Sequence, residues 1–200
     1  MRRLLVIVLA LVMLPVGSIA QEGRSELSLQ GTGFFTKDSS GLGTQQRSTE
    51  TGGFTLGYRY HFNRWLAVES NYGYERNTQE YFGGFGESRV QANVHAVTGD
   101  LVFKLPLPIR RISTYALTGG GDLIFDPTGN NSGSVPGASP QGKGAFLYGA
   151  FADDALTRHF SLRAEYRGFV YKSPDFGLSA LNTDSWTHTA QPSAGIVFRF

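Results

Sequence analysis

The sequence predicts an all-β fold, an antiparallel barrel of eight strands, from three observations. Apolar and polar residues alternate with a period of two in most segments, as expected of strands with one face in each environment. Short and long connections alternate between these segments. The composition combines 26 glycines and 13% aromatic residues with only 17% charged residues, which favours strands joined by turns over helices.

The first twenty residues are predicted to be an export signal rather than part of the fold. Two arginines follow the initiator methionine, residues 4–13 are an apolar run, and residues 18–20 match a small-x-small cleavage site. The run is too short to cross a bilayer core of about 30 Å as a helix. We therefore expect residues 1–20 to be a signal peptide and residues 21–200 to be one barrel domain.

Charge and cysteine content exclude several classes of function. The chain has 18 basic and 16 acidic residues, so loss of the two N-terminal arginines leaves sixteen of each sign. The basic character of the full chain therefore does not indicate a nucleic-acid partner. Cysteine is absent, which excludes disulfides and thiolate metal sites, and we expect no cofactor or metal.

The alternation identifies eight strands. Residues 52–62 place apolar side chains at even positions, and residues 66–75 repeat the pattern after a tight turn. In residues 90–105 the apolar positions change from even to odd after Ala96, which predicts a bulge or an upper part outside the bilayer. The faces of residues 145–153 cannot be assigned. The predicted strands are residues 26–35, 52–62, 66–75, 90–105, 112–125, 145–153, 160–167 and 193–200.

The connections support a membrane barrel. Bacterial outer-membrane barrels have short periplasmic turns, long outer loops and strands of about ten alternating residues. The short connections are residues 63–64, 106–111 and 154–159, and the long ones, rich in Gly, Ser and Asn, are residues 36–50, 76–89, 126–144 and 172–185. We expect the long connections to face the outside of the cell.

The charged side chains of the polar face determine which face points inward. They are Arg59, Glu69, Glu75, Asp100, Lys104, Asp122, Arg163, Glu165, Arg167 and Arg199. Facing lipid at mid-depth, each would cost roughly 2–4 kcal/mol, whereas an eight-stranded barrel is just wide enough for its side chains to fill and neutralise one another. The sequence therefore predicts an eight-stranded antiparallel up-and-down transmembrane β-barrel. The alternative is a soluble lipocalin-like barrel with an apolar interior.

Within the lumen we expect a charge network with the pairs Glu69–Arg59 and Glu165–Arg163 or Glu165–Arg167. Its expected members are Arg59, Glu69, Glu75, Arg163, Glu165 and Arg167. A plug that stabilises the barrel explains these residues, because a buried charge without its partner is strongly destabilising. The alternative is a gated pore.

Aromatic residues are expected to form a girdle at each membrane interface. Those near the short turns are Tyr60, Phe62, Trp65, Phe160, Phe198 and Phe200; those near the long loops are Phe54, Tyr72, Tyr74, Phe125 and Tyr166. The alternative places these rings in the core of a β-sandwich.

Three segments carry a resemblance to a known family, residues 56–69, 161–167 and 195–200. Together they resemble the OmpA/OmpX-type small outer-membrane barrels. The resemblance implies a monomeric or weakly associating barrel in the bacterial outer membrane that contacts lipid and lipopolysaccharide. It also implies export with periplasmic chaperones and insertion by the barrel assembly machinery. It further implies an assembly signal at the C-terminus, which Ile196, Phe198 and Phe200 match, and a role in envelope structure or adhesion, or as a narrow pore.

A catalytic role is less favoured than a structural role or a narrow pore, and no catalytic residue is predicted. Some outer-membrane barrels modify lipid with a histidine, a serine and an acid. His188 with Ser185 and Asp184, or His95 with Ser88, could form such a site only if the strands brought the side chains together.

Overall fold

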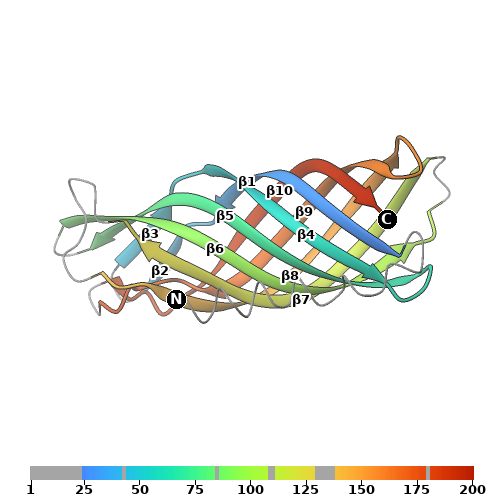
Figure 1. Ribbon diagram of the computed structural model, residues 1–200. Coiled ribbons are helices and arrows are strands. Elements are labelled where there is room, and N and C mark those ends of the chain that lie inside the picture. Colours follow the sequence, from blue (N-terminus) through green and yellow to red (C-terminus); the bar gives the residue numbers. More distant parts are fainter. Residues whose placement is uncertain (1–23, 42–43, 84–85, 108–110, 129–137, 179–180) are drawn as a thin grey trace.

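The computed structural model describes residues 24–41, 44–83, 86–107, 111–128, 138–178 and 181–200, so the predicted signal peptide lies outside the described residues. In this part of the chain eight long strands form the barrel and two short strands extend it at the long-loop end (Figure 1). The barrel strands are β1 (Ser25–Thr36), β4 (Thr51–His61), β5 (Leu66–Gly83), β6 (Gly86–Leu105), β7 (Ile112–Pro127), β8 (Gln141–Ala155), β9 (Phe160–Lys172) and β10 (Trp186–Arg199). The two short strands are β2 (Ser39–Gly41) and β3 (Thr44–Ser48).

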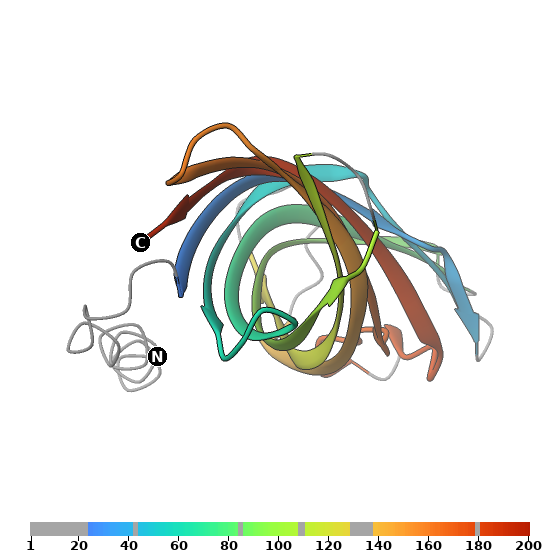
Figure 2. The ribbon, with the colours of Figure 1, turned by 90° about the vertical axis from the view of Figure 1, so that its right-hand side faces the viewer.

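The barrel is closed because the first and last strands pair with each other. Each barrel strand is antiparallel to its sequence neighbours, and Leu29 of β1 lies opposite Ile196 of β10 on one side and Leu56 of β4 on the other. The closed ring is seen along its axis in Figure 2. No helix in the described residues is long and apolar enough to cross a bilayer.

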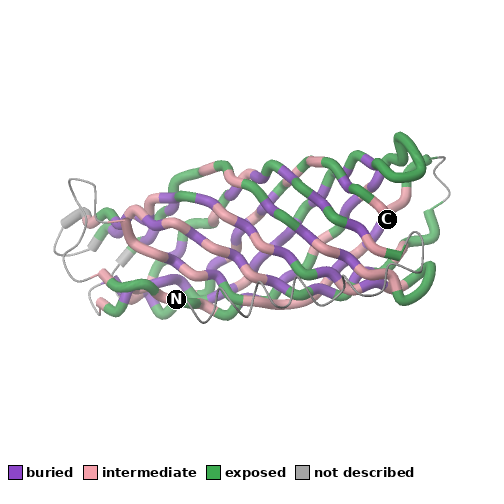
Figure 3. The backbone as a smooth tube through the Cα atoms, viewed as in Figure 1, coloured by how far each residue is buried: buried purple, intermediate pink, exposed green. Residues whose placement is uncertain are grey.

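The two faces of the wall have opposite chemistry. Leu29 is 52% exposed, whereas the adjacent Gln30 is 1% exposed, and Figure 3 shows this alternation along the strands. Large apolar side chains cover the outside, and polar and charged side chains fill much of the lumen. The predicted fold class, with its polar face inside, is confirmed.

Strand β6 contains no bulge. Its pairing with β5 runs without interruption from Leu66↔Phe103 to Gly83↔Gly86. The apolar positions change parity because Val90, Ala92 and Val94 face the lumen, where an apolar cluster lies near the long loops. The bulge alternative was therefore wrong. In β8, whose faces the sequence left unassigned, the odd-numbered residues point inward.

Three further expectations need correction. Residues 76–89 are not a long loop, because β5 and β6 continue as a hairpin to Gly83 and Gly86. Residues 36–50 contain β2 and β3, and β3 pairs with the outer part of β5. Asp122 is exposed, and Phe125 is fully buried in the lumen rather than part of a girdle.

Candidate functional site in the barrel lumen

The lumen is charged near the short turns, and near the long loops an apolar cluster packs beside buried uncharged polar side chains such as Asn77, Gln79 and Thr189. We call the charged set the charge network. Its members are Glu26, Arg59, Glu69, Asp100, Asp153, Arg163, Glu165 and Arg167, all at most 5% exposed.

Arg59 and Arg163 hold the part of the charge network nearest the short turns. Arg59 donates from Nε to Glu69 at 2.6 Å and from Nη1 to Glu26 at 3.1 Å. Arg163 makes a two-point contact with Asp153, at 2.7 and 2.9 Å, because the two residues lie directly opposite each other on β8 and β9. Both guanidinium groups also pack over the ring of Phe151, at 4.3 and 4.4 Å, where a cation is attracted to the aromatic face.

Arg167 lies further along the axis and joins three carboxylates. It contacts Glu69 at 2.6 Å, Asp100 at 3.4 Å and Glu165 at 2.5 Å. Asn71 donates a further hydrogen bond to Asp100 at 2.9 Å, and Gln30 donates one to Glu165 at 2.7 Å. Six strands, β1, β4, β5, β6, β8 and β9, are thus tied together across the lumen.

The charge balance of this set is nearly neutral. The charge network holds five carboxylates and three guanidinium groups, and Arg199 at its edge contacts Glu26 at 2.5 Å. Five carboxylates against four guanidinium groups leave one excess negative charge when all are ionised. Pairing of this density is required, because an unpartnered charge in a low-dielectric interior costs several kcal/mol.

The structure brings together five of the six residues expected in the network. Arg59 contacts Glu69, and Glu165 contacts Arg167 rather than Arg163. Glu75 lies apart: Thr32 and Gln191 donate hydrogen bonds to its carboxylate, and within the described residues no cation pairs with it. Sequence reasoning missed three members of the charge network. Asp100 was expected on the polar face but not in the network, and Glu26 and Asp153 were not considered for it.

The apolar cluster near the long loops is closed by a loop. Its larger members are Tyr81, Val90, Val94, Leu123, Phe125, Leu147, Phe169, Tyr171, Phe176 and Leu181. Phe176 comes from residues 173–178, which we call the outer cap, and its ring lies 6.4 Å from Phe125 and 6.5 Å from Tyr81.

Polar contacts hold the outer cap in place. Tyr81 donates to the Pro174 carbonyl at 2.7 Å, and Gln141 donates to Asp175 at 2.7 Å while accepting from the amides of Asp175 and Phe176. Partial burial raises the pKa of Asp175, but the hydrogen bonds from Gln141 and the Gly177 amide outweigh this effect and hold the pKa below its usual value.

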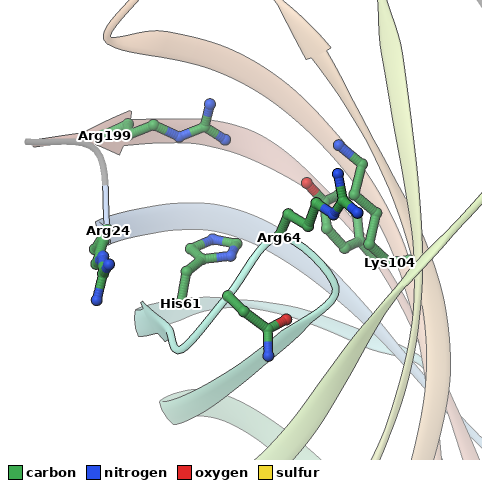
Figure 4. Close-up of a pocket in the computed structure, with 7 residues that line it drawn as sticks. Arg24, His61, Arg64, Lys104 and Arg199 are labelled. Atoms are coloured by element: carbon green, nitrogen blue, oxygen red, sulfur yellow. The ribbon is translucent and has the colours of Figure 1, made fainter.

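The opposite end of the lumen contains a pocket of about 330 Å³ at the short turns. It is lined by Arg24, His61, Asn63, Arg64, Lys104, Tyr115 and Arg199 (Figure 4). Two of these side chains, His61 and Arg199, contact Glu26 of the charge network, so the pocket lies directly against the network.

The residues considered for a lipid-modifying site are not assembled into one. His188 pairs with Tyr148 through Nε2 at 2.9 Å, Ser185 donates to the Ser40 carbonyl, and Asp184 pairs with Lys172. His95 pairs with Tyr72 at 2.8 Å. Among the described residues no cluster of three or more His, Cys, Asp or Glu side chains could hold a metal ion.

The residues expected to form the assembly signal lie on the lipid-facing side of the last strand. Ile196, Phe198 and Phe200 are 53%, 40% and 47% exposed. Phe198 also contacts the rings of Phe160 and Phe200, at 5.2 and 5.8 Å between centroids. The C-terminal aromatic residues therefore form a continuous strip on the outer wall.

The comparison with family models decides the identity of this fold. The model for the outer membrane protein beta-barrel domain matches residues 6–200. The chain belongs to this family. Its barrel therefore lies in the bacterial outer membrane, as expected, with the short turns in the periplasm and the long-loop end outside the cell. No curated protein matches the sequence.

Solved outer-membrane proteins share the fold at low sequence identity. OprG from Pseudomonas aeruginosa is 14% identical with a TM-score of 0.61, and the match covers 90% of this chain and 97% of OprG. AlkL is 16% identical with a TM-score of 0.58, covering 90% and 91%. Ail, the attachment invasion locus protein of Yersinia pestis, solved with the heparin analogue sucrose octasulfate, is 21% identical with a TM-score of 0.55, covering 90% and 100%.

Proposed function

We propose that this barrel is a closed, non-catalytic scaffold of the outer membrane that presents its outer strands for contact at the cell surface. The observation that carries the proposal is the filling of the lumen by side chains between the pocket at the short turns and the outer cap. The charge network occupies the periplasmic part, and the apolar cluster, with the buried polar side chains beside it and the outer cap, occupies the other part.

The filled lumen supports a structural role over a pore. Ions need a continuous path of water or polar groups. Near the long loops the aromatic side chains Phe125 and Tyr171 and the polar side chains Asn77 and Gln79 are all at most 1% exposed, so the side chains leave little room for water between them. The charge network adds a second barrier, because each of its arginines already has carboxylate partners.

The outer end supports a role in surface contact because it is built as a cross-linked sheet. Gln79 of β5 accepts hydrogen bonds from Gln46 and Ser48 of β3, at 2.6 and 2.5 Å. Ser39 of β2 pairs with Ser173 at 2.9 Å, which joins this sheet to the outer cap. We call β2, β3 and the outer parts of β5 and β6 the outer platform. Its rigidity lowers the entropic cost of binding a partner.

Two experiments test the proposal. Purified protein in planar bilayers is expected to give no steady current at any voltage, and stable ohmic steps would establish the pore alternative instead. For the surface role, replacing residues 38–48 with a short Gly-Ser linker is expected to leave a barrel that still migrates differently on a gel before and after heating. Cells producing this variant should bind less to wells coated with heparin, whose analogue sucrose octasulfate was bound in the Ail structure. Equal binding of variant, full chain and empty-vector cells would remove the surface role.

A further inference from the structure

The periplasmic pocket is lined by cationic side chains, and three of them form no ion pair within the described residues. We propose that it binds a phosphate ester, a phosphate group carrying a small organic substituent, at the periplasmic mouth of the lumen. The inference is independent of what the outer platform contacts.

The first support is the composition of the lining. Five of the seven lining residues are arginine, lysine or histidine, and none is acidic. They come from separate parts of the chain, and Figure 4 shows Arg199 and His61 on one side of the space with Arg64 and Lys104 on the other. Such convergence from several elements is a property of binding sites.

The second support is that the fold leaves three of these cations without an acidic partner. In the described residues Arg64 lies 5.4 Å from the Trp65 ring and Lys104 lies 5.9 Å from the Tyr115 ring, and neither they nor Arg24 contacts a carboxylate. Three such cations exceed the single excess negative charge of the adjacent charge network. The mouth is therefore net positive, which concentrates anions from the periplasm.

The carboxylate behind the pocket is already shared. Glu26 contacts His61 at 3.1 Å and Arg199 at 2.5 Å, and it also contacts Arg59 and Arg163 deeper in the lumen. One carboxylate divided among these groups cannot also neutralise Arg24, Arg64 and Lys104. An anion entering from the periplasm would meet little competition for those three side chains.

The donor geometry favours a phosphate. A guanidinium group matches two phosphate oxygens at once, and an ammonium group adds a point charge. Asn63 accepts hydrogen bonds at Oδ1 from the amides of Trp65 and Leu66, at 2.8 and 2.9 Å, so its amide NH₂ group is left as a donor. The tetrahedral oxygens of a phosphate can use several such donors together.

The size and walls of the pocket favour a substituent on that phosphate. A volume of about 330 Å³ lies at the lower end of the range for small-molecule sites, about 300–1,000 Å³. One wall is the ring of Tyr115, which stacks on Phe151 with centroids 4.6 Å apart. Such a wall suits the carbon frame of a glycerol or sugar phosphate.

The same chemistry has two sources, a soluble ester in the periplasm and the headgroup of an inner-leaflet phospholipid. Lys104 and Tyr115 lie opposite each other on the lumenal face, so a ligand would reach them from the aqueous mouth. The test must therefore separate the two sources.

The experiment uses the folded full-length barrel in neutral detergent, titrated by calorimetry with glycerol 3-phosphate and, as the uncharged probe, glycerol. We expect binding of the phosphate ester only. The double variant R64Q/K104Q, which removes no ion pair of the charge network, should weaken it at least tenfold. R158Q, which changes an exposed arginine of another periplasmic turn, should leave it unchanged.

Repeating the titration in nanodiscs identifies the source. Binding that persists in both phosphatidylcholine and phosphatidylglycerol nanodiscs supports a soluble ester. Binding of glycerol 3-phosphate that is present in phosphatidylcholine nanodiscs but absent in phosphatidylglycerol nanodiscs supports the lipid headgroup, because the anionic lipid then occupies the pocket. Absence of binding in detergent, or equal binding by R64Q/K104Q with its heat-dependent gel shift intact, would overturn the proposal.

Discussion

Replacing Arg163 with methionine tests how much the charge network contributes to stability. The change removes a two-point contact with Asp153 at 2.7 and 2.9 Å and contacts with Glu26 at 3.4 Å and Glu69 at 3.5 Å. The nearest remaining cation to Asp153 is Arg59, at 3.8 Å. Breaking a buried ion pair by removing one partner costs about 3–5 kcal/mol. With a urea slope of about 2 kcal/mol per M, the midpoint of unfolding should fall by about 1.5–2.5 M.

The assay is urea unfolding in lipid vesicles, followed by tryptophan fluorescence and by the gel shift of the folded form. R158M makes the same chemical change at an exposed turn and should move the free energy of unfolding by no more than about 0.5 kcal/mol. The double variant R163M/D153N removes both partners and should lose less than half as much as R163M. Equal midpoints for R163M and R158M would refute the view that these charges stabilise the barrel as a paired set.

Further predictions concern the apolar cluster, the outer wall, the C-terminus and the outer cap. F125A should cost about 3–5 kcal/mol by leaving a cavity, seen as a lower urea midpoint. L29R on the lipid face should cost about 2–4 kcal/mol at mid-depth, and no loss would contradict its outward position. Deleting Phe200 should move the protein from the outer-membrane to the periplasmic fraction. Because the folded pKa of Asp175 is lowered, its carboxylate stabilises the outer cap above about pH 4. That contribution is lost as the pH falls through the folded pKa; protease cleavage within the outer cap should rise then, and D175N should lack this dependence.

The membrane-spanning strands could be predicted because each residue there faces one of two very different environments. The alternation of Leu27 and Leu29 with Glu26, Ser28 and Gln30 records that difference directly. The same alternation puts Glu26 on the polar face, so the sequence does indicate that this member of the charge network points into the lumen.

The outer half could not be predicted in the same way because the rule changes there. Above the membrane both faces of a strand can be polar, so residues 76–89 resemble a loop although β5 and β6 continue through them. Inside the barrel, the apolar cluster puts apolar side chains on the lumenal face, which is polar elsewhere. For this reason Phe125 was wrongly predicted to lie in an aromatic girdle, and β6 was predicted to contain a bulge. Phe176 gave no signal, because its role depends on a loop folding back into the lumen.

Asp153 was missed for a related reason. Its strand carries small and aromatic residues on both faces, such as Gly149, Ala150 and Phe151, so hydropathy does not separate the two sides. Only the register opposite Arg163 identifies its direction.

The filled lumen is tested most directly by thiol access, because the chain has no cysteine of its own. Thr98 is 5% exposed and faces the lumen beside Asp100, whereas Glu50 is exposed at the long-loop end. A small charged thiol reagent should modify E50C at once and T98C only after unfolding. Rapid modification of T98C in the folded barrel would show a water-filled passage and contradict a closed barrel.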